Sequence, residues 1–158
     1  MSVASVREYL KQYGLDGRVM EFETSSATVG EAALAAGVEE ARIAKTLSFQ
    51  GEQEDTCILI VASGDARIDN KKFKIVFGRK ASMLSPDAAL RMTGYAVGGV
   101  CPFILPENVL VYLDISLKRF DIVYPACGSA NSAIPLSCDE LFASSKALGW
   151  VDVCKAGD

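Results

Sequence analysis

The chain has 158 residues, half of them hydrophobic, and a formal net charge of −4. This length and composition suit a single domain over residues 1–158, and the acidic balance argues against a domain that coats DNA or RNA through bulk charge. The sequence contains no histidine, which excludes Ser-His-Asp and Cys-His catalysis and the usual zinc-hydrolase ligand sets.

No apolar run approaches the roughly 20 residues of a membrane-spanning helix. The N-terminal segment MSVASVREYLKQYG carries charges early and has no apolar core of the secretory-signal type. We therefore expect a cytoplasmic protein without membrane contact. The five cysteines are odd in number and form no C-x-x-C spacing, which predicts reduced thiols, with no structural zinc. We expect no metal and no cofactor.

Capping residues, glycine stops and hydrophobic periodicity predict the elements. In chain order the patterns indicate a helix over 5–14, a strand over 18–25, helices over 28–38 and 39–47, strands over 46–50 and 55–63, a helix over 85–94, strands over 108–117 and 120–127, a helix over 137–149 and a strand over 150–154. Because several strands follow one another directly, this order is typical of an α+β fold and not of a doubly wound sheet.

Four segments contain residues suited to chemistry. In RIAKTL, Lys45 is predicted near the end of a helix, where a lysine also suits the helix dipole. In ASGDARID, two carboxylates follow the most hydrophobic strand, in a composition that is equally typical of a plain turn. Neither segment by itself decides between a structural and a functional role.

The other two segments are rich in small residues. YAVGGVCPF places tandem glycines before Pro102, which favours either a tight turn or a loop whose backbone approaches a ligand. ACGSANSAIP combines small residues with short polar side chains, as in an ordinary loop or in the wall of a small-molecule pocket.

A basic stretch, RIDNKKFKIVFGRK, contains six basic residues against one acid. It favours about equally a solvated strand edge, where lysine discourages aggregation, and a surface that contacts nucleic acid. In the second case Lys71, Lys72 and Lys74 are the candidate nucleic-acid contacts.

The segments KTL, SGDARIDNKK, TGYAVGGVCPF and GSANSAI occur in an order that resembles the YbaK/EbsC family, which is related to the editing domain inserted in bacterial prolyl-tRNA synthetases. The resemblance covers about residues 21–153. It implies an α+β fold with a mixed, mostly antiparallel sheet flanked by helices. It also implies a free-standing deacylase that hydrolyses the ester of mischarged tRNA at the 3′ acceptor end, with a small wrong amino acid (Cys, Ala or Ser) on tRNA(Pro).

The same resemblance implies the site residues. Lys45 corresponds to the family's essential lysine, and the Gly-x-x-x-Pro loop, with Gly98, Gly99 and Pro102, to its glycine loop. The family's amino-acid pocket corresponds to Thr46, Gly128 and Ser129. With such a substrate, the nucleic acid that Lys71, Lys72 and Lys74 would contact is tRNA. Cysteine-specific members carry an acidic residue in the segment that aligns with SAIPL, where this chain has Ala133, so the amino acid that is edited stays open.

Two other interpretations stay open. The fold could bind an aminoacyl-adenosine or a prolyl-tRNA synthetase partner without turnover, which the acidic balance and the absence of a separate tRNA-binding domain favour. Alternatively, Lys45 could form a Schiff base if its pKa were depressed, for example by Arg42 one helical turn earlier.

Overall fold

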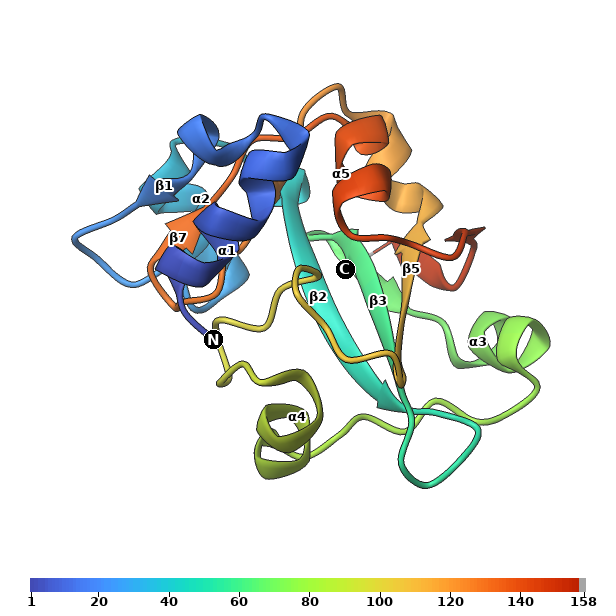
Figure 1. Ribbon diagram of the computed structural model, residues 1–158. Coiled ribbons are helices and arrows are strands. Elements are labelled where there is room, and N and C mark those ends of the chain that lie inside the picture. Colours follow the sequence, from blue (N-terminus) through green and yellow to red (C-terminus); the bar gives the residue numbers. More distant parts are fainter. Residues whose placement is uncertain (157–158) are drawn as a thin grey trace.

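The structure is a computed structural model that describes residues 1–156 (Figure 1). Its α-helices are α1 (Val3–Leu10), α2 (Val29–Ala36), α3 (Asn70–Phe77), α4 (Pro86–Thr93) and α5 (Cys138–Ser144). Its strands are β1 (Met20–Glu21), β2 (Ile43–Gln50), β3 (Cys57–Ser63), β4 (Ala66–Ile68), β5 (Val109–Asp114), β6 (Tyr124–Pro125), β7 (Ser132–Ala133), β8 (Trp150–Val151) and β9 (Cys154–Ala156). Short 3-10 turns are η1 (Lys11–Tyr13), η2 (Asp16–Arg18), η3 (Glu40–Arg42) and η4 (Ile115–Arg119).

Within the described residues the central sheet has five strands in the order β6-β2-β3-β5-β8. β2 and β3 form an antiparallel hairpin, with Ala44 opposite Ser63 and Gln50 opposite Cys57. The other three neighbouring pairs are parallel. The α+β fold with a mixed sheet flanked by helices is confirmed, but the expected antiparallel majority is wrong for this sheet. The long crossover through α3 and α4 brings β5 back in the direction of β3.

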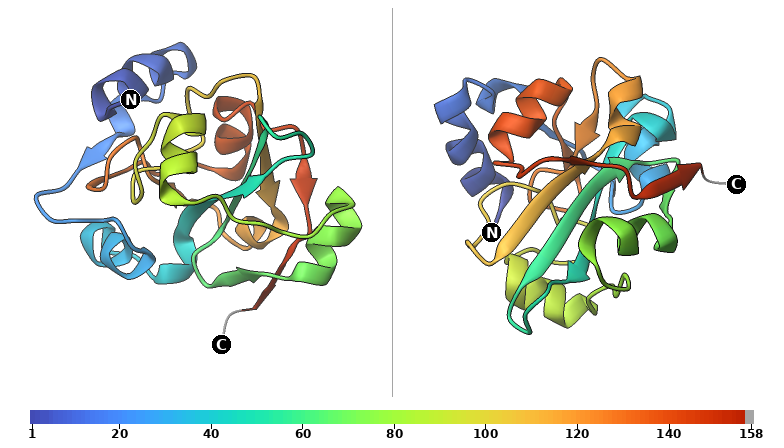
Figure 2. Two further views of the ribbon diagram at one scale, coloured as in Figure 1. Left: turned by 90° about the horizontal axis from the view of Figure 1, so that it is seen from below. Right: turned by 90° about the vertical axis from the view of Figure 1, so that its right-hand side faces the viewer.

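Helices cover both faces of the sheet (Figure 2). On one face, α1 and α5 contribute Val6, Leu10 and Leu141 to the larger core cluster. On the other face, Phe73 of α3 packs with residues of β2 and β3 in a second cluster. Because side chains alternate along a strand, β2 contributes Ala44 to the first cluster and Phe49 to the second.

The helix predicted over 39–47 is wrong. The chain makes one 3-10 turn, η3, and then enters β2 at Ile43. Pairing with β3 over seven residues supplies a ladder of hydrogen bonds that a single helical turn cannot match. Lys45 therefore lies within a strand and not at a helix end.

Three lysines of the basic stretch lie on a helix, α3, whereas Arg67 lies in the short strand β4. Asp69 caps α3 by accepting hydrogen bonds from the amides of Lys71 and Lys72, at 3.0 and 3.1 Å. Phe73 and Phe77, four residues apart, contact each other on the buried side with tilted rings, 4.7 Å between centroids.

The other boundaries follow the predicted capping residues. Thr28, Ser85 and Ser137 cap α2, α4 and α5 as predicted. Several elements are shorter than predicted. Only residues 20–21 of the 18–25 segment, 109–114 of 108–117 and 124–125 of 120–127 form strands, the 150–154 segment is divided between β8 and β9, and α5 ends at Ser144, well before residue 149.

The turn between β3 and β4 depends on Gly64. A methyl group there would overlap the carbonyl oxygen of Glu40 and meet a Val29 methyl at 2.8 Å. Gly64→Ala is therefore expected to lower the free energy of unfolding by about 1–3 kcal/mol through overpacking, measured by urea denaturation. Gly17→Ala is the matched control because nothing lies within 4 Å of its added methyl; equal stability of the two variants would contradict this account.

Candidate functional site

A cavity of about 410 Å³ opens beside β2. Its walls are the segment 26–29 at the start of α2, residues 43–48 of β2, the segment 83–86 at the start of α4, the glycine loop at residues 97–98, and Ser132 and Ala133 of β7. Most of the lining side chains are small, so the space between these elements stays empty.

The cavity coincides with a gap in the pairing of β2. Toward its start, β2 pairs with β6 at Ala44. Toward its end, the Ser48 carbonyl accepts from Leu84 N at 3.0 Å and Gln50 N donates to the Ser82 carbonyl at 2.8 Å. Between these contacts no described segment pairs with this edge, and Thr46 lies at the gap.

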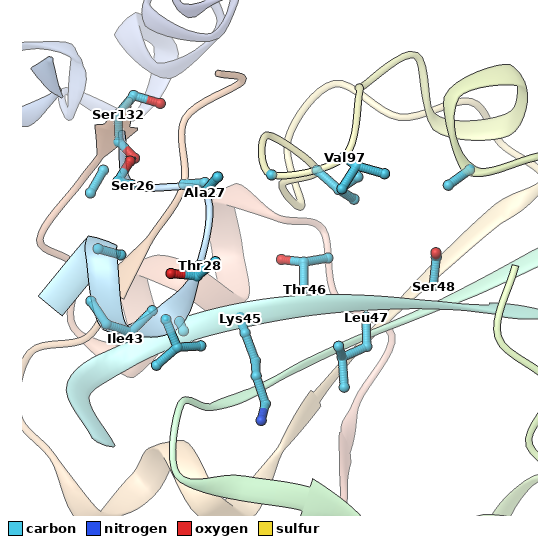
Figure 3. Close-up of a pocket in the computed structure, with 18 of the residues that line it drawn as sticks. Ser26, Ala27, Thr28, Ile43, Lys45, Thr46, Leu47, Ser48, Val97 and Ser132 are labelled. Carbon is cyan, nitrogen blue, oxygen red and sulfur yellow. The ribbon is translucent and has the colours of Figure 1, made fainter. Parts of the chain in front are cut away.

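The side chains of β2 alternate about this gap (Figure 3). Thr46 and Ser48 point to the side of Val97, whereas Lys45 and Leu47 point to the opposite side of the strand. Thr46 Oγ1 is buried and has no hydrogen-bond partner in the described chain. Two neighbouring hydroxyls of the strand therefore face the cavity.

The Lys45 ammonium is held away from Thr46. Nζ donates to the Gly64 carbonyl at 3.4 Å and to the Ala66 carbonyl. Burial lowers the pKa of Lys45, and the neighbouring Cys154 and Asp65 oppose this shift. The lysine is half-buried and joins β2 to the turn after β3, so it is not a freely solvated side chain.

The glycine loop packs against the small-residue loop, so the structure brings these two predicted segments together. Gly98 has φ of 87° and lines the cavity, and an added methyl would meet Ala27 Cβ at 2.8 Å. A methyl on Gly99 would meet the Ser129 backbone at 3.0 Å. Close packing and a positive φ therefore require glycine at residue 98, and close packing leaves little room for a side chain at Gly99.

Four predicted site residues do not line the cavity. Gly99 and Ser129 lie behind it, in the contact between the two loops. Gly128 packs against α1, where its added methyl would meet the Ser2 carbonyl at 3.0 Å. Pro102 lines a different cavity, near Tyr9 and β5.

The predicted tRNA-contact lysines lie on α3, which packs on the sheet face opposite Thr46 and Ser48. Figure 1 shows α3 and α2 on different sides of the molecule. Lys72 is engaged, with Nζ 3.0 Å from Asp152 Oδ1 and 2.9 Å from the Cys154 carbonyl. Lys71 and Lys74 are exposed.

All five cysteines lie in the described chain and are free thiols. Cys101, within the glycine loop, is fully buried, and burial raises the pKa of its thiol to about 11. Burial likewise raises the pKa values of Cys57 and Cys127. A thiolate is therefore disfavoured at these positions.

Residues 23–143 match the aminoacyl-tRNA editing domain family. The chain belongs to this family. It is 57% identical over 155 residues to the uncharacterized protein YwhH of Bacillus subtilis (strain 168), covering 98% of each chain.

Solved structures agree with this assignment. A protein proposed to be a trans-editing enzyme for prolyl-tRNA synthetase superposes with a TM-score of 0.85 at 30% identity, covering 98% of this chain and 97% of that one. The hypothetical protein APE2540 gives a TM-score of 0.83 at 30% identity, covering 95% and 99%.

Sequence reasoning missed part of the lining of this editing domain. Ser26, Ala27 and Ser48 line the cavity, and no motif marks the first two. For Ser48 a signal existed: Thr46 and Ser48 alternate with Leu47 and Phe49, which places two hydroxyls on one face of a strand. The strand predicted over 46–50 contains that alternation, but the helix predicted over 39–47 overlaps it at Thr46 and Leu47.

Lys45 of the editing domain is expected to titrate below the ordinary range of a lysine. In ¹³C NMR of reductively methylated protein, its resonance should shift at a lower pH than that of free dimethyl-lysine in solution. Because its pKa is lower in the folded state than in the unfolded state, the unfolded chain binds more protons between the two values, and stability should rise with pH across that window. Lys45→Met should remove this rise; a Lys45 titration that coincides with free dimethyl-lysine would contradict the burial argument.

Proposed function

We propose that this protein is a trans-editing hydrolase that cleaves the ester of mischarged tRNA, with tRNA(Pro) carrying a small wrong amino acid as its substrate. The observation that carries the proposal is the cavity at the gap in β2, in a chain of the aminoacyl-tRNA editing family. The whole chain would act as one editing domain in the cytoplasm. Its solved relative, proposed to act in trans for prolyl-tRNA synthetase, supports the choice of tRNA and names a candidate partner.

The chemistry needs positioning more than a strong base. An aminoacyl ester is already activated, and the neighbouring ribose hydroxyl can help to orient the attacking water. Oriented amides in a cavity that excludes water stabilise the charge that develops on the ester oxygen. This suits a chain without histidine whose thiols are protonated.

The cavity favours a substrate whose amino acid has a small, uncharged side chain. Ala133 is almost fully buried and lines the wall. Among the lining residues of the described chain, Lys45 alone carries a charge, and its ammonium points away (Figure 3). Alanine and serine therefore fit this cavity by polarity, and cysteine fits as a neutral thiol.

We assign Lys45 a positioning role in hydrolysis. Its ammonium bonds to the Gly64 and Ala66 carbonyls on the side of β2 opposite Thr46. It therefore acts by fixing β2, and with it Thr46, at the cavity. The lysines Lys71 and Lys74 would then contact a part of the tRNA remote from the acceptor end, because α3 lies on the other face of the sheet.

One observation favours the second candidate, a binding module without turnover. The essential lysine of the family is here bonded to main-chain carbonyls, so no charged side chain faces the cavity. The same bonds and the placement of Nζ disfavour a Schiff base at Lys45.

A panel of purified mischarged tRNAs tests the proposal. Alanyl-, seryl- and cysteinyl-tRNA(Pro) should be deacylated at catalytic enzyme concentrations, whereas prolyl-tRNA(Pro) should persist. Lys45→Ala should lower kcat/KM by about 10²-fold, as displaced catalytic geometry does, with partial rescue in Lys45→Arg.

The same variant separates two roles of the lysine. A positioning role predicts equal losses on tRNA and on a minimal aminoacyl-adenosine, while a contact with the terminal phosphate predicts a loss on tRNA only. Tight binding of aminoacyl-tRNA with no hydrolysis across the panel would establish the binding module instead.

Gly98 gives a further prediction with a matched control. Gly98→Ala should push the glycine loop away from Ala27 and lower kcat/KM for deacylation by about 10²-fold. Gly94 has a similar φ of 82°, but an added methyl there meets only Met1 Cγ, at 3.4 Å. Gly94→Ala should therefore share the backbone strain and keep the activity, and equal losses in both variants would assign the effect to strain alone.

A further inference from the structure

Thr46 presents main-chain groups to the cavity. In an antiparallel pair, alternate residues turn both N–H and C=O toward the partner strand or away from it. Gly51 N bonds to Thr56 O on the β3 side, whereas Ser48 and Gln50 bond outward to Leu84 and Ser82. The even-numbered residues of β2 therefore face outward, and Thr46 directs its N–H and C=O into the gap.

The main-chain N–H and C=O of Thr46 have no hydrogen-bond partner within residues 1–156. The Thr46 hydroxyl is likewise buried and unpartnered. Nearly all buried polar groups in proteins are hydrogen-bonded, so an unpaired donor and acceptor beside a cavity indicate a ligand that pairs with them. The gap is one outward-facing residue long, because β6 pairs with β2 at Ala44 and the segment 82–84 bonds to it from Ser48 onward.

An aminoacyl ester carries groups complementary to the Thr46 C=O and N–H, both attached to its α-carbon. Its α-ammonium donates hydrogen bonds and its ester carbonyl oxygen accepts them, as the N–H and C=O of a residue in a neighbouring strand do. No carboxylate lines the described cavity that could bind the ammonium instead. The Ser26 and Ser132 hydroxyls on the far wall already donate, to the Ser132 and Ser129 carbonyls at 3.5 and 3.2 Å.

We propose that the aminoacyl group of the substrate pairs with Thr46 as the missing residue of a neighbouring strand. Its α-ammonium donates to the Thr46 carbonyl, and its ester carbonyl oxygen accepts from Thr46 N–H. The inference rests on the proposed hydrolase function and adds a substrate requirement: a free α-amino group.

The pairing has a catalytic consequence. In attack by water, a bond forms from the water oxygen to the ester carbon, and the carbonyl electron pair moves onto the oxygen that Thr46 N–H contacts. This donor becomes a stabiliser of the developing oxyanion. The ribose oxygen then leaves with a proton, and the free amino acid and tRNA are released. An acyl group on the nitrogen leaves one N–H but removes the positive charge, and it extends the substrate along β2, where the gap is only one outward-facing residue long.

The first test compares alanyl-tRNA(Pro) with N-acetyl-alanyl-tRNA(Pro), or the same pair for the amino acid that the panel hydrolyses fastest. Because acetylation slows spontaneous hydrolysis, each enzymatic kcat/KM is divided by the spontaneous rate at the same pH. The normalised value should fall at least 100-fold on acetylation. A fall of less than tenfold overturns the inference.

The second test removes the main-chain donor. Proline is tolerated at a strand edge whose N–H faces away from the ladder, so Thr46→Pro deletes this N–H without breaking the pairing with β3. Thr46→Val is the matched variant, since it removes the hydroxyl and keeps the N–H. Thr46→Pro should lower kcat/KM at least 100-fold below Thr46→Val, with both variants folded by circular dichroism; equal activities overturn the inference.

Failure of the Thr46 pairing can be told apart from failure of the proposed hydrolase function. If Thr46→Pro fails to fold, the acetylation test in the wild-type protein still decides. Absence of hydrolysis for every aminoacyl-tRNA contradicts the hydrolase and this inference together. Hydrolysis that is equally fast for free and acetylated substrates contradicts the pairing with Thr46 alone.

Discussion

The antiparallel pairing of β2 with β3 is the constraint on which the site depends. Along β2, Leu47 and Phe49 face the second core cluster while Thr46 and Ser48 face the other side, so a one-residue slip of the register would move apolar side chains to the wrong face. The register fixes which groups of β2 face outward. It thereby places Thr46 and Ser48 on the cavity side and Lys45 on the other (Figure 3).

Two loops distant in sequence close the cavity from the other side. A Cβ atom on Gly98 would overlap Ala27 at 2.8 Å, and one on Gly99 would lie only 3.0 Å from the Ser129 backbone, tighter than an ordinary contact. The glycines therefore serve packing first, and the position of the loop over the cavity follows from that packing. This explains why tandem glycines sit beside a proline: the contact needs bare backbone, and the proline limits the freedom that glycine adds.

Charge is distributed away from the cavity. The basic residues of α3 lie on the opposite face of the sheet, and the Lys45 ammonium is bonded to carbonyl oxygens. The site thus offers neutral hydroxyls and main-chain amides in place of charged side chains. Such groups suit an activated ester, for which orientation and stabilisation of one oxyanion supply much of the rate enhancement.

The sequence by itself determined the local elements whose signals are short-range. The caps Thr28, Ser85 and Ser137 were predictable because a side chain bonds to amides two or three residues away. The order of four motifs also indicated the family. These signals need no knowledge of which segments meet in space.

Only the tertiary structure decided the geometry of the site. Whether residues 43–47 form a helix or a strand depends on pairing with β3, and the local pattern of this segment favours either one. The direction of the Lys45 side chain follows from that pairing. The gap at Thr46 exists because β6 and the segment 82–84 stop short of each other along one edge of β2. These two segments lie about 40 residues apart in the chain. Local sequence patterns carry no information on contact at such a separation.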